Sequence, residues 1–463
     1  MDTMESGKTV MIKTKEKKQK TILMTEGNIW KQLILFSIPL ILGNLLQQLY
    51  NTMDSVIVGN FVGSNALAAV GSSSSLIYLL IAFSTGAATG AGVVVAQLYG
   101  AGDKSKVQDA VHTALGIAVV LGIVLSVAGM IISPQILKWM KTPEEVMVQS
   151  VQYLRLYFAG VVFNVVYNMS AGILNAVGNS KRSLMYLGIA SGLNIGLDLF
   201  FIAVLKMGVA GAAIATDICQ GISSILIVSF LVRVPDKYQV TLKKIKIHKK
   251  MASSIIKIGL PAGIQNMVIS LSNVLVQAGV NGFGAKAMAG FGSYLKVDGF
   301  NILPVLSCSM AATTFTGQNY GAEKMDRVKK GMQVTVIMGI LYTVVTGILL
   351  LVLAQPIISI FTSDAEVIAY GVLATRYFCP FYFLLSIMHS LAGTVRGTGK
   401  TIPPMIIILC ALCVFRILWV QLVTPYFDTI RGIYLVYPLS WLIGAVLMVL
   451  YTWKGNWRQK GKL

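Results

Sequence analysis

The chain has 463 residues, of which 55% are hydrophobic and only 12% are charged. Soluble domains carry about twice that charged fraction, so the composition excludes an ordinary soluble protein and predicts a membrane protein. The net charge of +20 would fit a nucleic-acid partner only if the basic residues were gathered on one surface, and they are not.

Twelve apolar stretches follow one another along the chain, and each is long enough to cross about 30 Å of hydrocarbon as a helix. A backbone in lipid must satisfy its own hydrogen bonds, so we expect every stretch to be helical. The stretches lie at residues 30–56, 66–92, 110–133, 147–176, 182–205, 209–233, 252–281, 288–315, 327–353, 366–395, 402–424 and 432–453. The predicted fold is an all-α integral membrane protein with twelve transmembrane helices.

The basic residues predict how these helices are oriented. When the odd-numbered connections are assigned to the outside, 29 of the 38 Lys and Arg residues lie in the inside loops and tails, and five lie outside. This is the positive-inside pattern, and it predicts that both termini are cytoplasmic. The positive charge therefore indicates topology and contact with anionic membrane lipid, and it argues against a nucleic-acid partner.

The sequence of residues 60–181 is repeated at a shift of 221 residues. Gln97-Leu-Tyr-Gly-Ala becomes Gln318-Asn-Tyr-Gly-Ala, and further upstream Pro39 pairs with Pro261 at a shift of 222. With six spans in each half, both halves enter the membrane from the same side. We therefore expect two six-helix lobes related by a pseudo-two-fold axis along the membrane normal, with a cleft between them. Such a duplication is the usual construction of a secondary transporter.

The repeat also predicts the division of the chain into segments. These are a basic cytoplasmic tail at 1–27, an N-lobe at 28–236, a basic cytoplasmic linker at 237–251, a C-lobe at 252–453 and a cytoplasmic tail at 454–463.

Polar residues recur at helical spacing in the first span and in its repeat partner, the seventh span. An Asp at the bilayer centre costs about 2.5–3.5 kcal/mol, so such side chains must face protein or a wet cavity. The first span carries Gln48, Asn51 and Asp54, and the seventh carries Gln265, Asn266, Asn273 and Gln277. Two stripes on equivalent helices predict that both line the central cleft. The alternative is hydrogen bonding between helices, worth about 0.6 kcal/mol per bond.

Further polar residues lie in spans four to six, where we predict an oxygen-rich pocket together with Asp54. They are Asn164, Tyr167, Asn168 and Asn175 in span four, Asn194 and Asp198 in span five, and Thr216 and Asp217 at the start of span six. The repeat places Trp419 opposite Asp198 and Pro438 opposite Asp217, so the acids occur in one lobe only. This predicts a coupling-ion site, because buried carboxyl groups can exchange protons near neutral pH and the same oxygens can hold Na⁺.

Other ionisable residues in the spans are less specific. Asp298 in span eight fits a structural role and a place in the C-lobe wall of the cleft equally well, whereas we interpret the isolated His389 as a packed core residue. The chain also has 21 Met residues, which would suit a pliable, poorly selective apolar site.

The order of these features resembles the MATE (multidrug and toxic compound extrusion) family over nearly the whole chain, closer to its DinF-like branch. The matching residues are Pro39, Asp54 and Gly59 in the first span, Gln97-Leu-Tyr-Gly-Ala, Gly211-Ala-Ala-Ile-Ala-Thr216 and Gln318-Asn-Tyr-Gly-Ala. The resemblance implies two six-helix lobes, an H⁺- or Na⁺-binding network at Asp54, Asn194, Asp198 and Thr216, and a hinge at Pro39. The chain departs from the branch that has an acidic residue in the seventh helix, and the family pattern gives no role for Asp217.

The resemblance implies a secondary active exporter of organic, often cationic, compounds that works by H⁺ or Na⁺ antiport through alternating access. It further implies a protein of the bacterial cytoplasmic membrane that has no enzymatic activity and no cofactor, and we expect a monomer. One alternative is a lipid-linked saccharide flippase of the same superfamily, which a prominent cationic cavity would favour. A membrane-embedded enzyme is an alternative of a different class, and it would need clustered catalytic or metal-binding residues.

Overall fold

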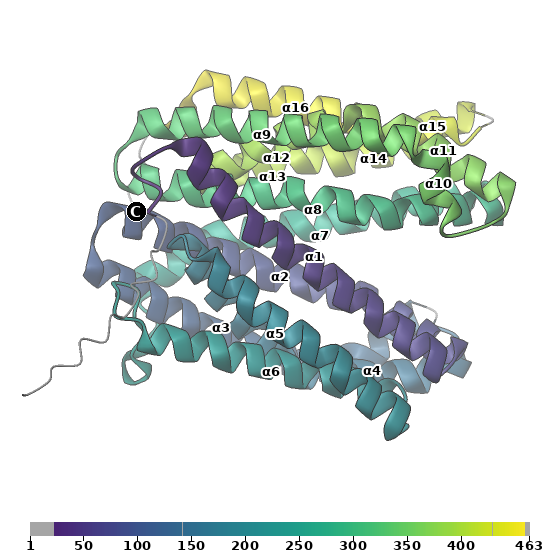
Figure 1. Cartoon of the computed structure of the whole chain (residues 1–463), viewed down its shortest axis with the longest axis horizontal. Helices are drawn as coiled ribbons and strands as arrows, with labels where there is room; N and C mark the ends of the chain where they lie inside the picture. Colours follow the sequence, from purple (N-terminus) through teal and green to yellow (C-terminus); the bar gives the residue numbers. More distant parts are fainter. Residues whose placement is uncertain (1–22, 141, 428, 459–463) are drawn as a thin grey trace, which may run out of the picture.

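The computed structural model describes residues 23–140, 142–427 and 429–458, and this part of the chain contains helices but no strand (Figure 1). The predicted cytoplasmic tails at 1–27 and 454–463 lie largely outside the described residues.

The first half of the chain forms six long helices. They are α1 (Ile29–Phe61), α2 (Ser64–Ala101), α3 (Lys104–Trp139), α4 (Glu144–Ala176), α5 (Ser180–Asp198), which continues as a π-helix (Leu199–Val204), and α6 (Val209–Arg233). Several extend well beyond the apolar runs that predicted them, because helix ends outside the hydrocarbon can be capped. Asp103, for example, accepts from the backbone N–H of Lys106 (3.1 Å), which lowers the pKa of this carboxyl group below its usual value.

The second half repeats this order with more interruptions. Its elements are α7 (Lys249–Asn281), α8 (Ala285–Gly321), α9 (Met325–Val352), α10 (Ala354–Ser359), α11 (Ala365–Phe378), α12 (Tyr382–Gly397), α13 (Ile402–Leu409), α14 (Phe415–Leu418), α15 (Arg431–Tyr434) and α16 (Val436–Lys454). Two π-helical segments, Cys410–Val414 and Trp419–Val423, flank α14. In the described part of the chain, 11 segments are long and apolar enough to cross a membrane. The remaining expected span, 288–315, lies in the 37-residue helix α8, which is long enough but more polar.

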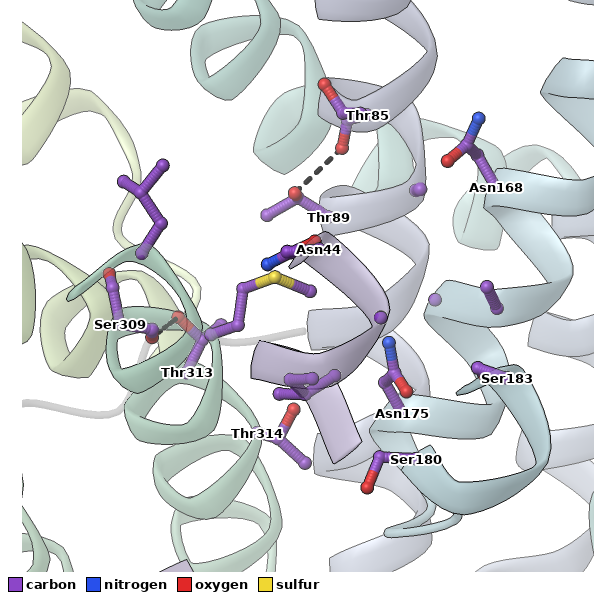
Figure 2. Close-up of a pocket in the computed structure, with 18 of the residues that line it drawn as sticks. Asn44, Thr85, Thr89, Asn168, Asn175, Ser180, Ser183, Ser309, Thr313 and Thr314 are labelled. Carbon is purple, nitrogen blue, oxygen red and sulfur yellow. Dashed lines mark hydrogen bonds between the residues drawn. The ribbon is translucent and has the colours of Figure 1, made fainter. Parts of the chain in front are cut away.

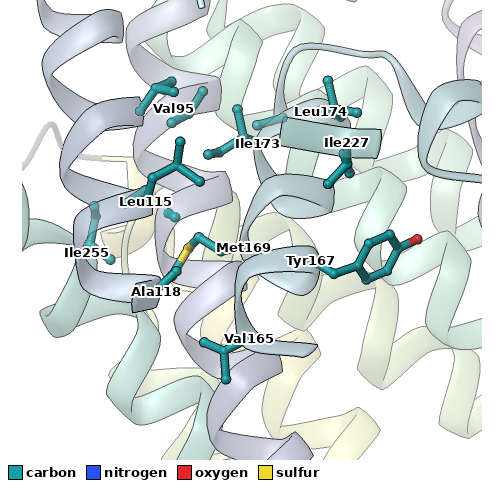
Figure 3. Close-up of a cluster of buried hydrophobic side chains, with 14 of the residues drawn as sticks. Val95, Leu115, Ala118, Val165, Tyr167, Met169, Ile173, Leu174, Ile227 and Ile255 are labelled. Atoms are coloured by element: carbon teal, nitrogen blue, oxygen red, sulfur yellow. The ribbon is translucent and has the colours of Figure 1, made fainter. Parts of the chain in front are cut away.

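Each half has its own apolar core, but α7 contributes to both. Figure 3 shows the N-terminal cluster, to which Val95 of α2, Leu115 of α3, Met169 of α4 and Ile227 of α6 all contribute. Ile255, in the first turns of α7, packs into the same cluster. The start of the second repeat is thus held in the core of the first.

Glycines allow the backbones of α2 and α7 to approach closely. A Cβ atom on Gly86 would lie 2.5 Å from the Cα atom of Gly263, and one on Gly90 would lie 2.3 Å from the carbonyl oxygen of Ile255. We call this contact the α2–α7 seam. The pseudo-equivalent pair, α1 and α8, has Ser37, Ile41, Ser307 and Ala311 at the corresponding positions. There, the Asn44 amide donates to the Ser307 hydroxyl (3.0 Å) instead.

The two halves are closest at the end of the bundle where α1 begins and α16 ends, and they diverge toward the opposite end (Figure 1). A pair of hydrogen bonds crosses between them at the close end. Gln97 donates to the Gly397 carbonyl (2.7 Å) and Gln318 donates to the Ala176 carbonyl (2.7 Å). Both partners are related by the 221-residue shift, so this contact, which we call the glutamine closure, follows the pseudo-two-fold axis.

The backbones also meet at the glutamine closure. A Cβ atom on Gly100 would lie 1.9 Å from the carbonyl oxygen of Gln318, and one on Gly321 would lie 1.9 Å from that of Gln97. The segment before α1 fastens the same end, because Met24 donates its N–H to the Gln318 side chain (2.9 Å). The repeated Gln-x-Tyr-Gly-Ala motif is therefore where the two halves touch at this end of the bundle.

Candidate functional site

A cavity of about 380 Å³ lies between the two halves (Figure 2). This volume is within the usual range of small-molecule sites, about 300–1,000 Å³. Its polar lining consists of Asn44 and Gln47 of α1, Thr85 and Thr89 of α2, Tyr167, Asn168 and Asn175 of α4, Ser180 and Ser183 of α5, Gln265 and Asn266 of α7, Ser309, Thr313 and Thr314 of α8, and His389 and Arg396 of α12. Leu40, Leu184, Leu303, Leu306 and Met310 add apolar surface.

The two walls of the cavity are related by the repeat but differ in chemistry. Thr85 and Thr89 correspond to Leu306 and Met310 at the 221-residue shift, and both pairs line the cavity. Equivalent helices of the two halves thus line the two walls. At these positions the α2 wall has hydroxyl groups and the α8 wall has apolar groups.

Several residues predicted for the cleft lie elsewhere. Gln48 faces α8, where its Nε2 is 4.0 Å from the position of a Cβ atom on Gly299. Asn51 does not line the cavity. Of the span-four residues predicted for the pocket with Asp54, Asn164 accepts from the amide of Asn168 (2.9 Å), and the others line the cavity instead. On α7, the Gln277 amide donates to Asn281 (2.9 Å) in an exposed position. The polar side chains of one long helix therefore have different surroundings. Along its length the helix passes the cavity, neighbouring helices and the protein surface.

The acidic residues of the N-terminal half form a separate cluster away from the cavity. Asp54 comes from α1, Asn194 and Asp198 from α5 and Thr216 from α6, and their exposed fractions are only 8%, 2%, 0% and 7%. Asp54 faces both Asp198 and Thr216. The cluster is positioned by the packing of α1 and α6 against α5, which changes from α- to π-helix directly after Asp198.

The polar atoms of this acidic cluster are poorly satisfied by the protein. Both Asp198 oxygens, one Asp54 oxygen, the Thr216 hydroxyl and both amide atoms of Asn194 are buried without a hydrogen-bond partner in the described part of the chain. Each such group costs about 1–3 kcal/mol, so stability alone does not explain the arrangement. A set of buried, unpaired carboxylate, amide and hydroxyl oxygens is suited to a proton or a hard cation.

Asp217 points away from this cluster, into a notch on α4. A Cβ atom on Gly160 would lie 2.0 Å from the Asp217 carboxylate, so only glycine leaves room for the acid. The side chain is half-buried.

A second polar network lies inside the C-terminal half and contains two of the residues predicted for the cleft, Asp298 and Asn273. Asp298 accepts hydrogen bonds from the hydroxyls of Tyr294 (3.4 Å) and Tyr382. The buried guanidinium of Arg416 donates to Asn273 (3.0 Å) and lies near the Asp298 carboxylate. Arg416 also donates to Ser440 (3.0 Å) and lies over the Tyr437 ring, 4.4 Å from its centroid. In this network the positive charge of Arg416 offsets the negative charge of Asp298. The four residues of the acidic cluster include no positive charge.

Replacing Arg416 by Leu should lower the stability of the protein strongly. The change leaves Asn273 and Ser440 without their donor and Asp298 without its nearby positive charge, and breaking a buried charge pair costs about 3–5 kcal/mol. We expect a clear decrease in the thermal unfolding midpoint, measured by tryptophan fluorescence in detergent. Arg155→Gln, at an exposed arginine, is the control, and an Arg416→Leu protein as stable as this control would contradict the assignment.

Two bundles of membrane-spanning helices that enclose a polar cavity define a membrane transporter. The MatE family model matches the chain twice, at residues 39–200 and 261–420, so the chain belongs to the MATE family of multidrug efflux transporters. This confirms the predicted family and fold class, and it also establishes that the protein is a transporter and not an enzyme.

Named relatives match over almost the whole chain. A probable multidrug resistance protein of Bacillus subtilis, YpnP, is 30% identical, with 94% of this chain and 97% of the relative covered. The probable multidrug resistance protein NorM of Thermotoga maritima is 26% identical, with 94% of each covered. Among solved structures, an outward-facing MATE transporter of the MOP superfamily matches with a TM-score of 0.87 at 24% identity, covering 95% of this chain and 98% of that one. This last similarity concerns the fold alone.

Two cavity residues are not among those that the sequence predicts for the cleft. Arg396 follows the tenth apolar run, as an inside-loop residue would, yet it lines the cavity, and the buried His389 lines it as well. The repeat contains the signal that could have found them, because the 221-residue shift takes Asn168 to His389 and Asn175 to Arg396.

Proposed function

We propose that the protein is a secondary active exporter that moves organic compounds out of the bacterial cytoplasm in exchange for H⁺ or Na⁺. The observation that carries this proposal is the buried, unpaired acidic cluster at Asp54 and Asp198, which lies in one half only and is separate from the central cavity. The names of the relatives, both probable multidrug resistance proteins, support organic compounds as the cargo.

Helix α1 connects the two sites. It carries Asn44 and Gln47 in the cavity wall and Asp54 in the acidic cluster, about 10–15 Å further along at 1.5 Å per residue. Pro39, on the same helix, lines the cavity and lacks the backbone N–H that a straight helix would use. A change in charge at Asp54 therefore acts on the same rigid element that contacts the cargo, and Pro39 is the proposed hinge.

The arrangement of the two halves supports alternating access. The glutamine closure joins them at the end where α1 begins and α16 ends, and in the proposed cycle the cavity is open toward the opposite end, where the halves diverge. With both termini cytoplasmic, as the basic residues predict, this is an outward-facing state. Cation binding at Asp54 and Asp198 from outside then shifts α1 and releases the cargo. We propose that the protein works as a monomer in the cytoplasmic membrane, surrounded by lipid. The proposal includes no cofactor and no nucleic-acid partner.

The test is transport by the full chain reconstituted in liposomes. Liposomes with an acidic interior, or with Na⁺ inside, are given ethidium or norfloxacin outside, and uptake is followed by fluorescence. An antiporter should accumulate at least one compound as H⁺ or Na⁺ leaves, and nigericin or monensin should abolish this accumulation. Uptake that is independent of both gradients would contradict antiport.

A further inference from the structure

Arg396 is an unpaired positive charge in the central cavity. It lies in the last turn of α12, and the only other ionisable side chains among the described lining residues are Tyr167 and His389. No carboxylate lines the cavity in the part of the chain that the structure describes. A guanidinium has five N–H donors, and within the described residues that of Arg396 makes no hydrogen bond or ion pair.

Other arginines of the chain that are partly or fully buried have partners. Arg416 is surrounded by Asn273, Ser440 and the Tyr437 ring, and Arg327 donates to Asn319 (3.1 Å). Arg396 is only partly buried and faces the cavity, so its guanidinium is accessible to a group bound there.

The repeat shows that the positive charge is specific to one wall of the cavity. Asn175, the counterpart of Arg396, lines the opposite wall, and seven residues earlier on each helix Asn168 is the counterpart of His389. Residues seven apart lie on the same face of a helix. The wall formed by α4 thus presents two amides, and the wall formed by α12 presents an imidazole and a guanidinium at the same positions.

We propose that Arg396 binds an anionic group of the transported compound, so that the cavity takes organic anions and zwitterions with an apolar body. The inference rests on the proposed function and deepens it, because it names the class of cargo. The guanidinium fork pairs with both oxygens of a carboxylate, sulfonate or phosphate, while Leu40, Leu303 and Met310 contact the apolar body. A purely cationic compound would meet no acidic side chain among the described lining residues.

Two compounds that differ only in the acidic group provide the test: norfloxacin, a zwitterion, and its methyl ester, which retains the cation. Binding to the purified full chain is measured by equilibrium dialysis, without any ion gradient. Wild type should bind norfloxacin about tenfold or more tightly than the ester, as expected for a charge-assisted hydrogen bond. Arg396→Gln should abolish this preference, Arg396→Lys should keep part of it, and Arg155→Gln should behave as wild type.

Several outcomes would overturn the anion site. These are equal affinity of wild type for both compounds, an unchanged preference in Arg396→Gln, or an equal loss of both compounds in this variant. The comparison in wild type decides the question even if Arg396→Gln fails to fold. Displacement of norfloxacin by phosphatidylglycerol but not phosphatidylcholine, lost in Arg396→Gln, would support the site and identify a lipid headgroup as the anion. A preference for norfloxacin without gradient-driven uptake would contradict the antiport proposal and support the anion site.

Discussion

Asp54→Asn and Asp198→Asn should each reduce drug-evoked ion flux by at least tenfold. The amide keeps the size of the carboxyl group but can neither bind a proton nor balance the charge of Na⁺. Both side chains are almost completely buried, so a solvent-exposed group cannot take over the role of the lost carboxyl group. The measurement is the change in internal pH, or in internal Na⁺, when norfloxacin is added to liposomes containing the reconstituted protein.

Drug binding should lose its response to the coupling ion in these two variants. Neither Asp54 nor Asp198 lines the cavity, so norfloxacin should still bind, but its affinity in equilibrium dialysis should no longer change with pH or Na⁺ as that of wild type does. Asp326→Asn, at an acid whose side chain is 93% exposed, is the matched control for loss of one carboxylate. Ion flux at the wild-type rate in both Asp54→Asn and Asp198→Asn would remove the coupling assignment.

Gly100→Ala should nearly abolish transport, because the added methyl group cannot fit at the glutamine closure. The new Cβ atom would lie 1.9 Å from the carbonyl oxygen of Gln318, which is backbone and cannot rotate away. The two halves must then separate at this end, and the hydrogen bonds of Gln97 and Gln318 lengthen or break. We expect norfloxacin uptake to fall by about tenfold or more, since overpacking costs about 1–3 kcal/mol.

The same helix supplies a control for this substitution. A Cβ atom on Gly71 of α2 would meet no atom within 4 Å, and the same is true of its repeat partner, Gly292 of α8. Gly71→Ala and Gly292→Ala should therefore transport at the wild-type rate. Spin labels on opposite sides of the closure should report a longer distance in Gly100→Ala, and an unchanged distance together with full transport would show that the closure is unimportant.

The helices and the family could be predicted from the sequence because both depend on patterns that extend over many residues. Apolar runs identified the spans, and the 221-residue repeat identified the two halves. The end of α2 and the start of α3 could not be predicted in the same way, because they depend on single capping residues, Gly102 and Asp103, outside the apolar runs. The α2–α7 seam was also missed, since a glycine in a helix does not show which backbone approaches it.

The candidate site was harder to predict because a polar residue in a span can face several environments. Asp54 and Asp198 come together, whereas Asp298 joins Tyr382 and the vicinity of Arg416 in the other half. Arg396 lies at the end of a helix, where sequence patterns favour an exposed loop residue. Only the packing of α12 against α8 and α2 places it beside the cavity.

The α2–α7 seam gives the two duplicated halves unequal mechanical roles. Because the backbone of α7 contacts that of α2 at Gly86 and Gly90, we expect its amides Gln265 and Asn266 to stay in place during the proposed transport cycle. Both α1 and α7 contain a proline, but α1 lacks these glycine contacts and is the one that carries a buried acid, Asp54. Duplication thus supplied two similar helices, and the glycine contacts hold one of them, so that in the proposed cycle α1 is the helix that moves.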